Sequence, residues 1–462
     1  MKVHLSGACG TAMASLAGLL RERGHEVTGS DQDVYPPMST QLEALGIPLR
    51  SPYAAENVPA DADVVVIGNA LSRGNPEVEA VLDRKQRMTS LPALLAEDFL
   101  RERTSVVVAG THGKTTTSAL LAFLLDRAGL DPSFLVGGVP IDFERSYKLG
   151  RGSAFVVEGD EYDSAFFDKR PKFVHYLPEI AVIGNVEYDH ADIYPDLEAV
   201  TTAFFRLMTV IPRRGLLVAG IESPALRELL PRAFCRVETF GVEVDADWRA
   251  VDLRPGRDGW RFRLARHGAD LGEFRIAIPG EHNVRNALAA IAAAAGLGIE
   301  PARLREGLAA FRGVKRRLEL RGEARGVRIY DDFAHHPTAV RETLRALRAL
   351  EGGRLVAVFE PRSYTSRTRV FQDDFARAFS EADEVVIAAA FLPGRVPETQ
   401  RISERDLVAG IEARGRRARF VPTVEAIVGA LRDELREGDR VAILSNGGFG
   451  GIHDKLLAAL RA

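Results

Sequence analysis

Short apolar runs recur along the chain, and each is followed by a turn and then by a helical pattern. The runs at 2–6, 105–109 and 354–359 begin three such blocks, and the first two turns are rich in glycine. Strands that alternate with helices in this way predict parallel sheets covered by helices. We therefore expect an α/β fold in which the same strand, turn and helix sequence begins three times.

Further apolar runs complete the blocks and suggest where they divide. Strands are expected at 63–68, 154–158, 180–185, 216–219, 384–388 and 440–445, and a last helix at 452–460. The charged stretch 97–104 and the segment 313–317 are the expected boundaries. We predict three domains: a Rossmann-like N-terminal domain (1–103), a central P-loop ATPase domain (104–314) and a Rossmann-like C-terminal domain (315–462).

Composition agrees with this organisation and excludes several classes of protein. A chain of 462 residues is expected to hold about three domains. The 61 basic and 64 acidic side chains give a net charge of −3, which argues against a dedicated nucleic-acid binder. Two cysteines fit a cytoplasmic location better than a disulfide framework. Apolar runs are shorter than the about 20 residues that span a bilayer, so we expect no membrane insertion.

The most informative segment follows the strand at 105–109 and opens a helix. Its two glycines would let backbone N–H groups close around phosphate oxygens, Lys114 supplies a charge, and the Thr115 hydroxyl suits Mg²⁺. The usual phosphate loop has another glycine five residues before the position of Gly113, where this chain has Val108, so the loop is a shortened variant. Simple capping of a helix is the alternative. The expected ATP contacts here are Gly110, Thr111, His112, Gly113, Lys114, Thr115 and Thr116.

Magnesium needs further oxygen ligands, and the next two strand ends offer candidates. Glu158 ends one apolar run, and the segment 183–192 carries His190 among several acids. Binding sites in open α/β sheets lie at the carboxyl ends of strands, where these residues are expected. Alternatively, Glu158 is a surface carboxylate and His190 is structural.

The first glycine turn suggests a second site for a phosphate-bearing ligand. Gly7 and Gly10 follow the first strand, and Asp31 stands about twenty residues further on, which imitates a dinucleotide-binding fingerprint. The turn lacks the full G-x-G-x-x-G pattern. An NAD-dependent dehydrogenase and a plain tight turn therefore both remain open.

Three later polar clusters each permit two interpretations. The amides of Asn283 and Asn286 would either cap the following helix or bond to a base edge. Arg317 belongs to a charge run that is either solvated or faces phosphates. The acids and histidines of 331–337 suit either a metal or nucleotide hydroxyls. Loops at 359–363 and 445–453 follow strands of the third block and could carry ligands.

Taken in order, the motifs GTHGKTTT, NVEYDHAD, EHNVRN, VKRRLE and DDFAHHP resemble those of the ATP-dependent Mur ligases of bacterial cell-wall synthesis. The resemblance covers essentially the whole chain. Segments 33–40, 159–178 and 445–453 are similar to the recycling branch, the murein peptide ligases. That branch joins UDP-N-acetylmuramate to L-alanyl-γ-D-glutamyl-meso-diaminopimelate through an acyl phosphate. The branch that adds L-alanine is the alternative, and a catalytically silent nucleotide-binding regulator is a third class.

The resemblance also implies roles for individual residues. The N-terminal domain would bind the UDP sugar, the central domain ATP, and the C-terminal domain the peptide. The enzyme would be a monomer or weak homodimer, open before its ligands bind. Implied magnesium ligands are Thr115, Glu158 and His190; nucleotide contacts include Asn283, Asn286, Arg317 and Asp332; catalytic residues are Lys114, Glu158, His190, Arg317 and His335; substrate contacts are Gly7, Gly10, Asp31, Asn69 and Arg362.

Overall fold

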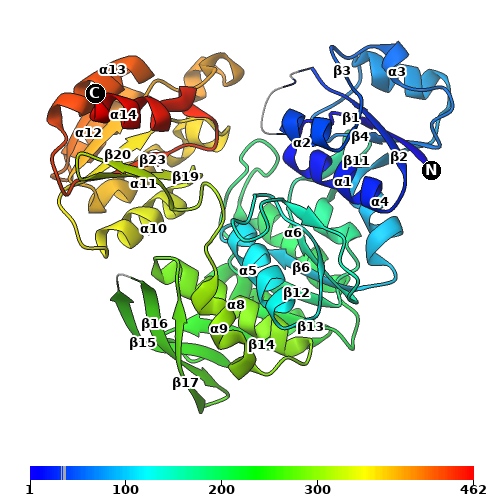
Figure 1. Cartoon of the computed structure of the whole chain (residues 1–462), viewed down its shortest axis with the longest axis horizontal. Helices are drawn as coiled ribbons and strands as arrows, with labels where there is room; N and C mark the ends of the chain where they lie inside the picture. The colour runs from blue at the N-terminus through cyan, green and yellow to red at the C-terminus, as the bar shows by residue number, and fades with distance from the viewer. Residues whose placement is uncertain (33, 35–37, 257) are drawn as a thin grey trace.

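The chain folds into three domains, each built around its own large sheet (Figure 1). The computed structural model describes residues 1–32, 34, 38–256 and 258–462. Part of the segment 33–40, which contributed to the expected branch, lies outside the described residues. The α/β class with three domains is confirmed, while the exact domain limits remain predictions.

The N-terminal domain has a five-stranded parallel sheet in the order β3-β2-β1-β4-β5. This is the strand order of a Rossmann fold without its sixth strand, and its ligands are expected beyond the carboxyl ends of β1 and β4. The elements are β1 (Lys2–Ser6), α1 (Thr11–Glu22), β2 (Glu26–Ser30), α2 (Met38–Ala44), β3 (Leu49–Arg50), β4 (Val64–Ile67), α3 (Pro76–Asp83), β5 (Met88–Ser90) and α4 (Leu91–Leu95).

The central domain places the phosphate-loop strand in the middle of a ten-stranded sheet. Strand β6 (Thr104–Ala109) pairs in parallel with β9 (Ala154–Glu158) and β12 (Ile180–Ile183), so three strands end at one edge. Five of its six residues are buried. The surrounding elements are α5 (Lys114–Arg127), β7 (Ser133–Leu135), β8 (Tyr147–Lys148), β10 (Asp163–Ala165), β11 (Asp168–Pro171), α6 (Leu197–Thr209), β13 (Leu216–Gly220), α7 (Pro224–Leu229), β14 (Arg236–Val242), α8 (Glu281–Gly296) and α9 (Arg305–Ala310).

Both edges of this sheet differ from the expected parallel pattern, and at one of them β8 pairs antiparallel with β7. Strands β15 (Trp248–Gly256), β16 (Gly259–Arg266) and β17 (Ala269–Ile276) form an antiparallel meander that extends the sheet beyond β14. Connections of two residues can join only antiparallel neighbours, because a parallel pair needs a long crossover. The expectation of purely parallel sheets is therefore wrong at both edges.

The C-terminal domain has a six-stranded sheet in the order β18-β19-β23-β20-β21-β22, of which only β18 runs antiparallel to its neighbour. Helices cover both faces and bury two apolar clusters. The elements are β18 (Glu319–Ala324), β19 (Val327–Asp332), α10 (Pro337–Arg348), β20 (Leu355–Phe359), α11 (Gln372–Ala378), β21 (Glu384–Ile387), α12 (Glu404–Glu412), β22 (Arg417–Phe420), α13 (Val424–Glu434), β23 (Arg440–Leu444) and α14 (Ile452–Arg461).

The N-terminal domain docks on the central domain through α1. Ser15 shares a hydrogen bond of 2.6 Å with Ser146, and Glu22 accepts from Arg145 at 2.7 Å. Gly18 faces Tyr147 so closely that a Cβ would lie 2.0 Å from the ring. Glycine at this position therefore permits the close contact between the two domains.

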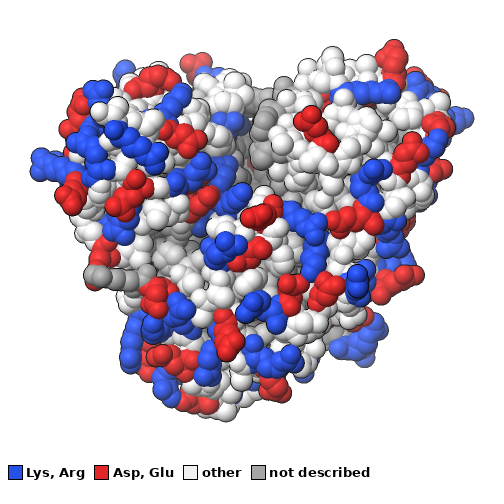
Figure 2. Space-filling view, in the orientation of Figure 1, with Lys and Arg blue, Asp and Glu red and all other residues white. Residues whose placement is uncertain are grey.

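The surface shown in Figure 2 mixes charges of both signs over all three domains, in keeping with the net charge of −3. Among the described residues, helices are all too short or too polar to cross a membrane.

Candidate active site

The phosphate loop leaves β6 and enters α5 through two glycines in conformations that other residues rarely adopt. Gly110 has φ +129° and Gly113 has φ +82°. A Cβ on Gly110 would lie 3.0 Å from the Gly184 nitrogen, and one on Gly113 would lie 2.5 Å from Asn286 Oδ1. Both positions therefore require glycine for conformation and for space. The loop is a more specialised structure than a simple helix cap.

Lys114 lies at the centre of the loop and is almost buried. Its Nζ donates to Glu161 Oε2 at 2.8 Å and to the Gly110 carbonyl at 2.8 Å. Burial alone would lower the pKa of Lys114, but the carboxylates of Glu161 and Asp160 outweigh it and raise the pKa. The ammonium group is therefore charged and is held inside the phosphate loop by Glu161.

Glu161 is a central residue of the site that sequence reasoning missed. Its side chain is 1% exposed and joins Lys114 to His190, whose Nε2 lies 2.9 Å from Glu161 Oε1. Burial raises the pKa of Glu161, whereas Lys114 and His190 lower it, and the net shift is downward. The only local signal was the cluster of acids that follows β9.

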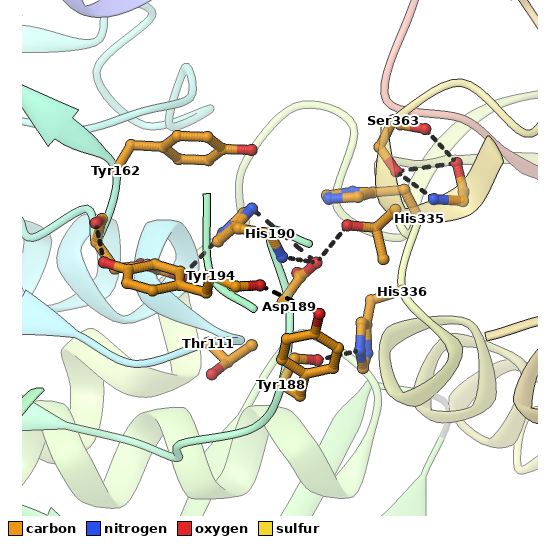
Figure 3. Close-up of polar contacts among 12 residues, drawn as sticks. Thr111, Tyr162, Tyr188, Asp189, His190, Tyr194, His335, His336 and Ser363 are labelled. Carbon is orange, nitrogen blue, oxygen red and sulfur yellow. Dashed lines mark hydrogen bonds and ion pairs between the residues drawn. The ribbon is translucent and has the colours of Figure 1, made fainter. Parts of the chain in front are cut away.

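The expected magnesium ligands fall into two groups. Thr115 Oγ1 donates to Glu158 Oε1 at 2.9 Å, because the loop and the end of β9 meet at the same edge of the sheet. His190 instead contacts Glu161 and lies over Tyr162, with ring centroids 4.2 Å apart (Figure 3). The backbone of His190 has a positive φ of 55°, a strained conformation that is common at functional sites.

The chemistry of Thr115 and Glu158 fits a magnesium ion. Both present hard oxygen atoms beside a phosphate loop, which is the donor type that Mg²⁺ prefers. Burial lowers the pKa of His190, but its contact with Glu161 outweighs this and raises the pKa. The Nε2 atom of His190 is occupied by Glu161 in this structure, so it could bind a metal ion only if that contact were exchanged.

A cavity of about 140 Å³ lies beside the loop and gathers most of the expected nucleotide contacts. Asn286 lines it and donates to Asn283 at 3.0 Å, while Asn283 donates to the Pro279 carbonyl. Asp332 accepts from the backbone of Leu318 and Ala334, and burial raises its pKa. The expected contacts that line the cavity are His112, Gly113, Lys114, Thr116, Asn283, Asn286, Arg317 and Asp332.

Arg317 reaches this region from the far side of the domain junction. Its guanidinium donates to Thr115 Oγ1 at 3.3 Å and lies over the ring of Phe333 at 4.9 Å. The aromatic ring holds the side chain without neutralising it. The Arg317 guanidinium thus points toward the phosphate loop. This favours the interpretation in which the charge run faces phosphates over the one in which it is solvated.

Further hydrogen bonds join the central and C-terminal domains at the segment after β12 (Figure 3). Thr338 donates to Glu187 at 2.7 Å, Thr365 donates to Asp189 at 3.0 Å, and His336 Nε2 lies 3.1 Å from the Tyr188 carbonyl. These hydrogen bonds hold the two domains against one another in this structure, and an open arrangement before the ligands bind stays a prediction. The sequence offered no signal for Thr338 or Thr365, because their partners are more than 150 residues away in the chain.

His335 is held beside the same junction by its own loop. Its Nδ1 lies 2.9 Å from the Phe333 carbonyl, so this nitrogen carries the proton. Burial lowers the pKa of His335, although the nearby Asp189 opposes the shift. His335 is therefore a neutral imidazole with a free lone pair on its other nitrogen.

Arg362 lies apart from the residues at the phosphate loop. It belongs to the loop 359–363 and packs against the loop 445–453 of the C-terminal domain. Its guanidinium is 3.6 Å from the Phe391 ring centroid, and a Cβ on Gly447 would lie 1.9 Å from its Nε. The two loops expected to carry ligands therefore meet at Arg362.

The expected sugar-binding residues follow the carboxyl ends of β1, β2 and β4. Asp31 accepts from the Cys9 nitrogen at 2.8 Å and from the Tyr53 hydroxyl at 3.0 Å, so its carboxylate supports the glycine turn. Gly7 lies against Gly68, the residue before the exposed Asn69. Gly10 is the N-cap of α1.

Comparison with known families identifies this architecture. The N-terminal residues 2–103 match the model of the Mur ligase family catalytic domain, residues 108–294 the Mur ligase middle domain, and residues 316–447 the Mur ligase glutamate ligase domain. The chain belongs to the Mur ligase family. Members of this family are ATP-dependent carbon–nitrogen ligases, so the dehydrogenase alternative is wrong.

Two branches of the Mur ligase family are represented among similar curated proteins. UDP-N-acetylmuramate–L-alanyl-gamma-D-glutamyl-meso-2,6-diaminoheptandioate ligase of Escherichia coli (strain K12) is 44% identical over 463 residues, covering 100% of this chain and 98% of that protein. UDP-N-acetylmuramate–L-alanine ligase of Solibacter usitatus is 36% identical and covers 99% and 95%.

Solved structures rank the same two branches differently. A murein peptide ligase from Psychrobacter arcticus is 37% identical with a TM-score of 0.75, covering 100% of this chain and 99% of that chain. A UDP-N-acetylmuramate-alanine ligase from Thermotoga maritima is 25% identical with a TM-score of 0.82, covering 99% and 98%. A TM-score over three domains depends on how they are oriented, whereas identity reflects side chains. Sequence identity is therefore the better guide to the branch.

Proposed function

We propose that this Mur ligase joins the tripeptide L-alanyl-γ-D-glutamyl-meso-diaminopimelate to UDP-N-acetylmuramate at the expense of ATP, in peptidoglycan recycling. The observation that carries the chemistry is the convergence of Lys114, Thr115, Glu158 and Arg317 on one loop at a domain junction. The full-length identity of 44% to a ligase named for this tripeptide supports the choice of substrate.

The phosphates of ATP would lie against the backbone N–H groups of the loop, with Lys114 on one side and Arg317 on the other. A magnesium ion held by Thr115 and Glu158, and by His190 after it leaves Glu161, would neutralise phosphate charge. The muramate carboxylate attacks the γ-phosphorus in line, and ADP leaves. In phosphoryl transfer, positioning and charge stabilisation supply most of the catalysis. We assign both tasks to Lys114 and Arg317.

The second half of the reaction forms the amide. The α-amino group of the peptide attacks the carbonyl of the acyl phosphate, and the tetrahedral intermediate collapses to amide and inorganic phosphate. Water would hydrolyse the acyl phosphate, so the closed junction formed by Thr338, Thr365 and His336 serves to exclude it. His335, a neutral imidazole at this junction, is our candidate for a contributing catalytic group.

Each domain then has one ligand. The UDP sugar binds at the N-terminal domain, the nucleotide binds beside Asn283, Asn286 and Asp332, and the peptide reaches Arg362. We place the enzyme in the cytoplasm, as a monomer or weak homodimer. The expected sugar contacts are Gly7, Gly10, Asp31 and Asn69.

Phosphate release with ATP, Mg²⁺ and UDP-N-acetylmuramate tests the proposal. We expect turnover with the tripeptide and at least about tenfold lower kcat/KM with free L-alanine, a difference of about 1.4 kcal/mol in transition-state stabilisation. Preference for L-alanine would move the protein to the alanine-adding branch, whose Thermotoga maritima member shares its domain arrangement. Nucleotide binding without an amide product from either amine would indicate a regulator instead.

A further inference from the structure

We propose that His112, Glu187 and His336 form a second metal site, suited to zinc, that ties the central domain to the C-terminal domain. One ligand atom from each residue lies within 4.8 Å of the other two. The His112 Nε2 and Glu187 Oε2 atoms are 3.4 Å apart. Ligands about 2.0–2.2 Å from a tetrahedral zinc are about 3.3–3.6 Å apart, so small rotations of the side chains would complete this site.

The surrounding hydrogen bonds already orient two of the ligands. Tyr188 offers a carbonyl 3.1 Å from His336 Nε2, so this nitrogen must donate (Figure 3). The lone pair is then on Nδ1, where it accepts from the Thr338 nitrogen at 3.3 Å and caps α10, a bond that a metal ion would replace. Thr338 also donates its hydroxyl to Glu187 at 2.7 Å. Metal-binding histidines usually donate their second nitrogen to a carbonyl or carboxylate, and ligating carboxylates are hydrogen-bonded in turn.

The protonation states also suit a metal. Burial lowers the pKa of His336 to about 4, so the ring is neutral at pH 7. Burial raises the pKa of Glu187, but His112 and Thr338 outweigh it and bring the pKa to about 2. Two of the three residues, Glu187 as an ionised carboxylate and His336 as a neutral imidazole, are therefore in the state that metal binding requires.

The donor set distinguishes this site from the magnesium site of the proposed function. Two imidazoles and one carboxylate favour zinc and related transition metals, whereas Mg²⁺ prefers oxygen ligands. Thr115 and Glu158 are not among the three residues. His112 and Glu187 both line a cavity of about 400 Å³ beside the nucleotide cavity, which gives an ion a route to the site.

The location predicts what a bound ion would do. His112 and Glu187 belong to the central domain, and His336 is the N-cap of α10 in the C-terminal domain. An ion bound by all three would resist opening of the junction. If product release requires that opening, which rests on the proposed function, zinc would inhibit turnover even in excess Mg²⁺.

Binding can be measured without any substrate. We would titrate the full chain with Co²⁺ and Zn²⁺ in excess Mg²⁺, following the visible absorption of four-coordinate cobalt and its loss on displacement by zinc. One equivalent is expected to bind. Glu187→Gln keeps the shape of the carboxylate, and His336→Asn keeps a side chain that can cap α10. Each should weaken binding by at least about tenfold.

Two matched variants locate the ion. His267→Asn removes an exposed histidine on the β16–β17 turn, and Glu158→Gln alters the proposed magnesium site; neither should change zinc affinity. The proposal is overturned if the wild type binds no more tightly than His336→Asn. It is equally overturned if Glu158→Gln weakens binding as much as Glu187→Gln.

Inhibition is measured separately, as the zinc concentration that halves phosphate release relative to the basal rate of each variant. We expect this concentration to rise at least about tenfold in Glu187→Gln and His336→Asn, matching their loss of affinity. Tight binding without inhibition would contradict the effect on opening and leave the site standing. Absence of ligase turnover in the wild type would contradict the proposed function, and the binding result would remain.

Discussion

The two glycine turns of this chain share a scaffold but differ in charge. Gly7 follows β1 with φ +88°, and Gly113 precedes α5 with φ +82°. At the first turn, the Asp31 carboxylate accepts from the Cys9 backbone. At the second, the Lys114 ammonium donates to the Gly110 carbonyl. A strand, glycine turn and helix therefore provide a place for a ligand, and the adjacent side chains determine the charge it can carry.

The buried acids beneath the two turns extend the contrast. Glu77 is fully buried under the first turn and accepts from Ser6, Ser30 and Asn57, and His4 Nε2 lies 3.7 Å from its carboxylate. Glu161, beside the second turn, is paired with the cation Lys114 and with His190. Both acids have a histidine partner, and only Glu161 is also paired with a lysine. We therefore expect loss of Glu77 to lower stability and loss of Glu161 to lower activity.

The largest effect is expected from Lys114→Ala. Loss of a cation that faces the transferred phosphate should lower kcat by at least about 1000-fold. The variant also leaves Glu161 with one fewer partner in a buried position, which destabilises the fold by up to about 3–5 kcal/mol. Steady-state phosphate release and thermal unfolding measure the two effects.

A double variant separates them. Lys114→Met with Glu161→Gln removes both charges while keeping approximate volume, so it should recover much of the lost stability but none of the activity. Turnover of Lys114→Ala within tenfold of the wild type would contradict the role assigned to this lysine.

The next largest effect is the difference in stability between Gly113→Ala and Gly7→Ala, which place an alanine at each of the two turns. In Gly113→Ala, a positive φ is combined with a Cβ 2.5 Å from Asn286 Oδ1, whereas in Gly7→Ala the nearest atom is 3.7 Å away. Backbone strain alone costs about 1–3 kcal/mol. Gly113→Ala should lose about 1–2 kcal/mol more than Gly7→Ala in chemical denaturation, because the added contact is an overpacking effect.

The two variants should also differ in which substrate they bind less well. Gly113→Ala is expected to raise the KM for ATP, and Gly7→Ala the KM for the UDP sugar. Equal effects of both variants on the KM for ATP would contradict the division of ligands between the two turns.

Local patterns were sufficient to predict the scaffold but only part of the site. The strand and helix around Gly113 were predicted correctly, because an apolar run, a glycine turn and helix-forming residues are adjacent in the sequence. The close contact between Asn286 and Gly113 was not predictable, since Asn286 lies 173 positions further along the chain. Glu161 was missed because burial, rather than residue type, distinguishes it from the neighbouring acids.

Glu77→Gln tests the structural acid. Burial raises the pKa of Glu77, but contacts with His4, Ser30, Ser6 and Asn57 outweigh it and bring the pKa to about 2, below its usual 4.5. A carboxylate with a lowered pKa stabilises the fold above its unfolded pKa. That stability is lost as the pH falls from about 4.5 to about 2, and amounts to about 3 kcal/mol at most.

The substitution should therefore destabilise the protein by about 2 kcal/mol at pH 7 and by much less near pH 3. Chemical denaturation at several pH values measures the difference between variant and wild type. A difference that stays constant down to pH 3 would show that the charge of Glu77 is not what stabilises the turn.

The smallest effect is expected from Asp31→Asn, which tests whether the first turn needs a charge at all. The amide oxygen of asparagine can still accept from the Cys9 nitrogen, but a weaker, neutral hydrogen bond replaces a charge-assisted one. We expect a loss of about 1 kcal/mol in stability and a small change in the KM for the UDP sugar. Because a phosphate-bearing ligand is anionic, removal of the negative charge should lower that KM if the diphosphate approaches Asp31, and raise it if Asp31 contacts a hydroxyl. The sign of the change in KM distinguishes the two cases. A decrease in KM caused by lost charge repulsion should also become smaller at high salt, because salt screens that repulsion.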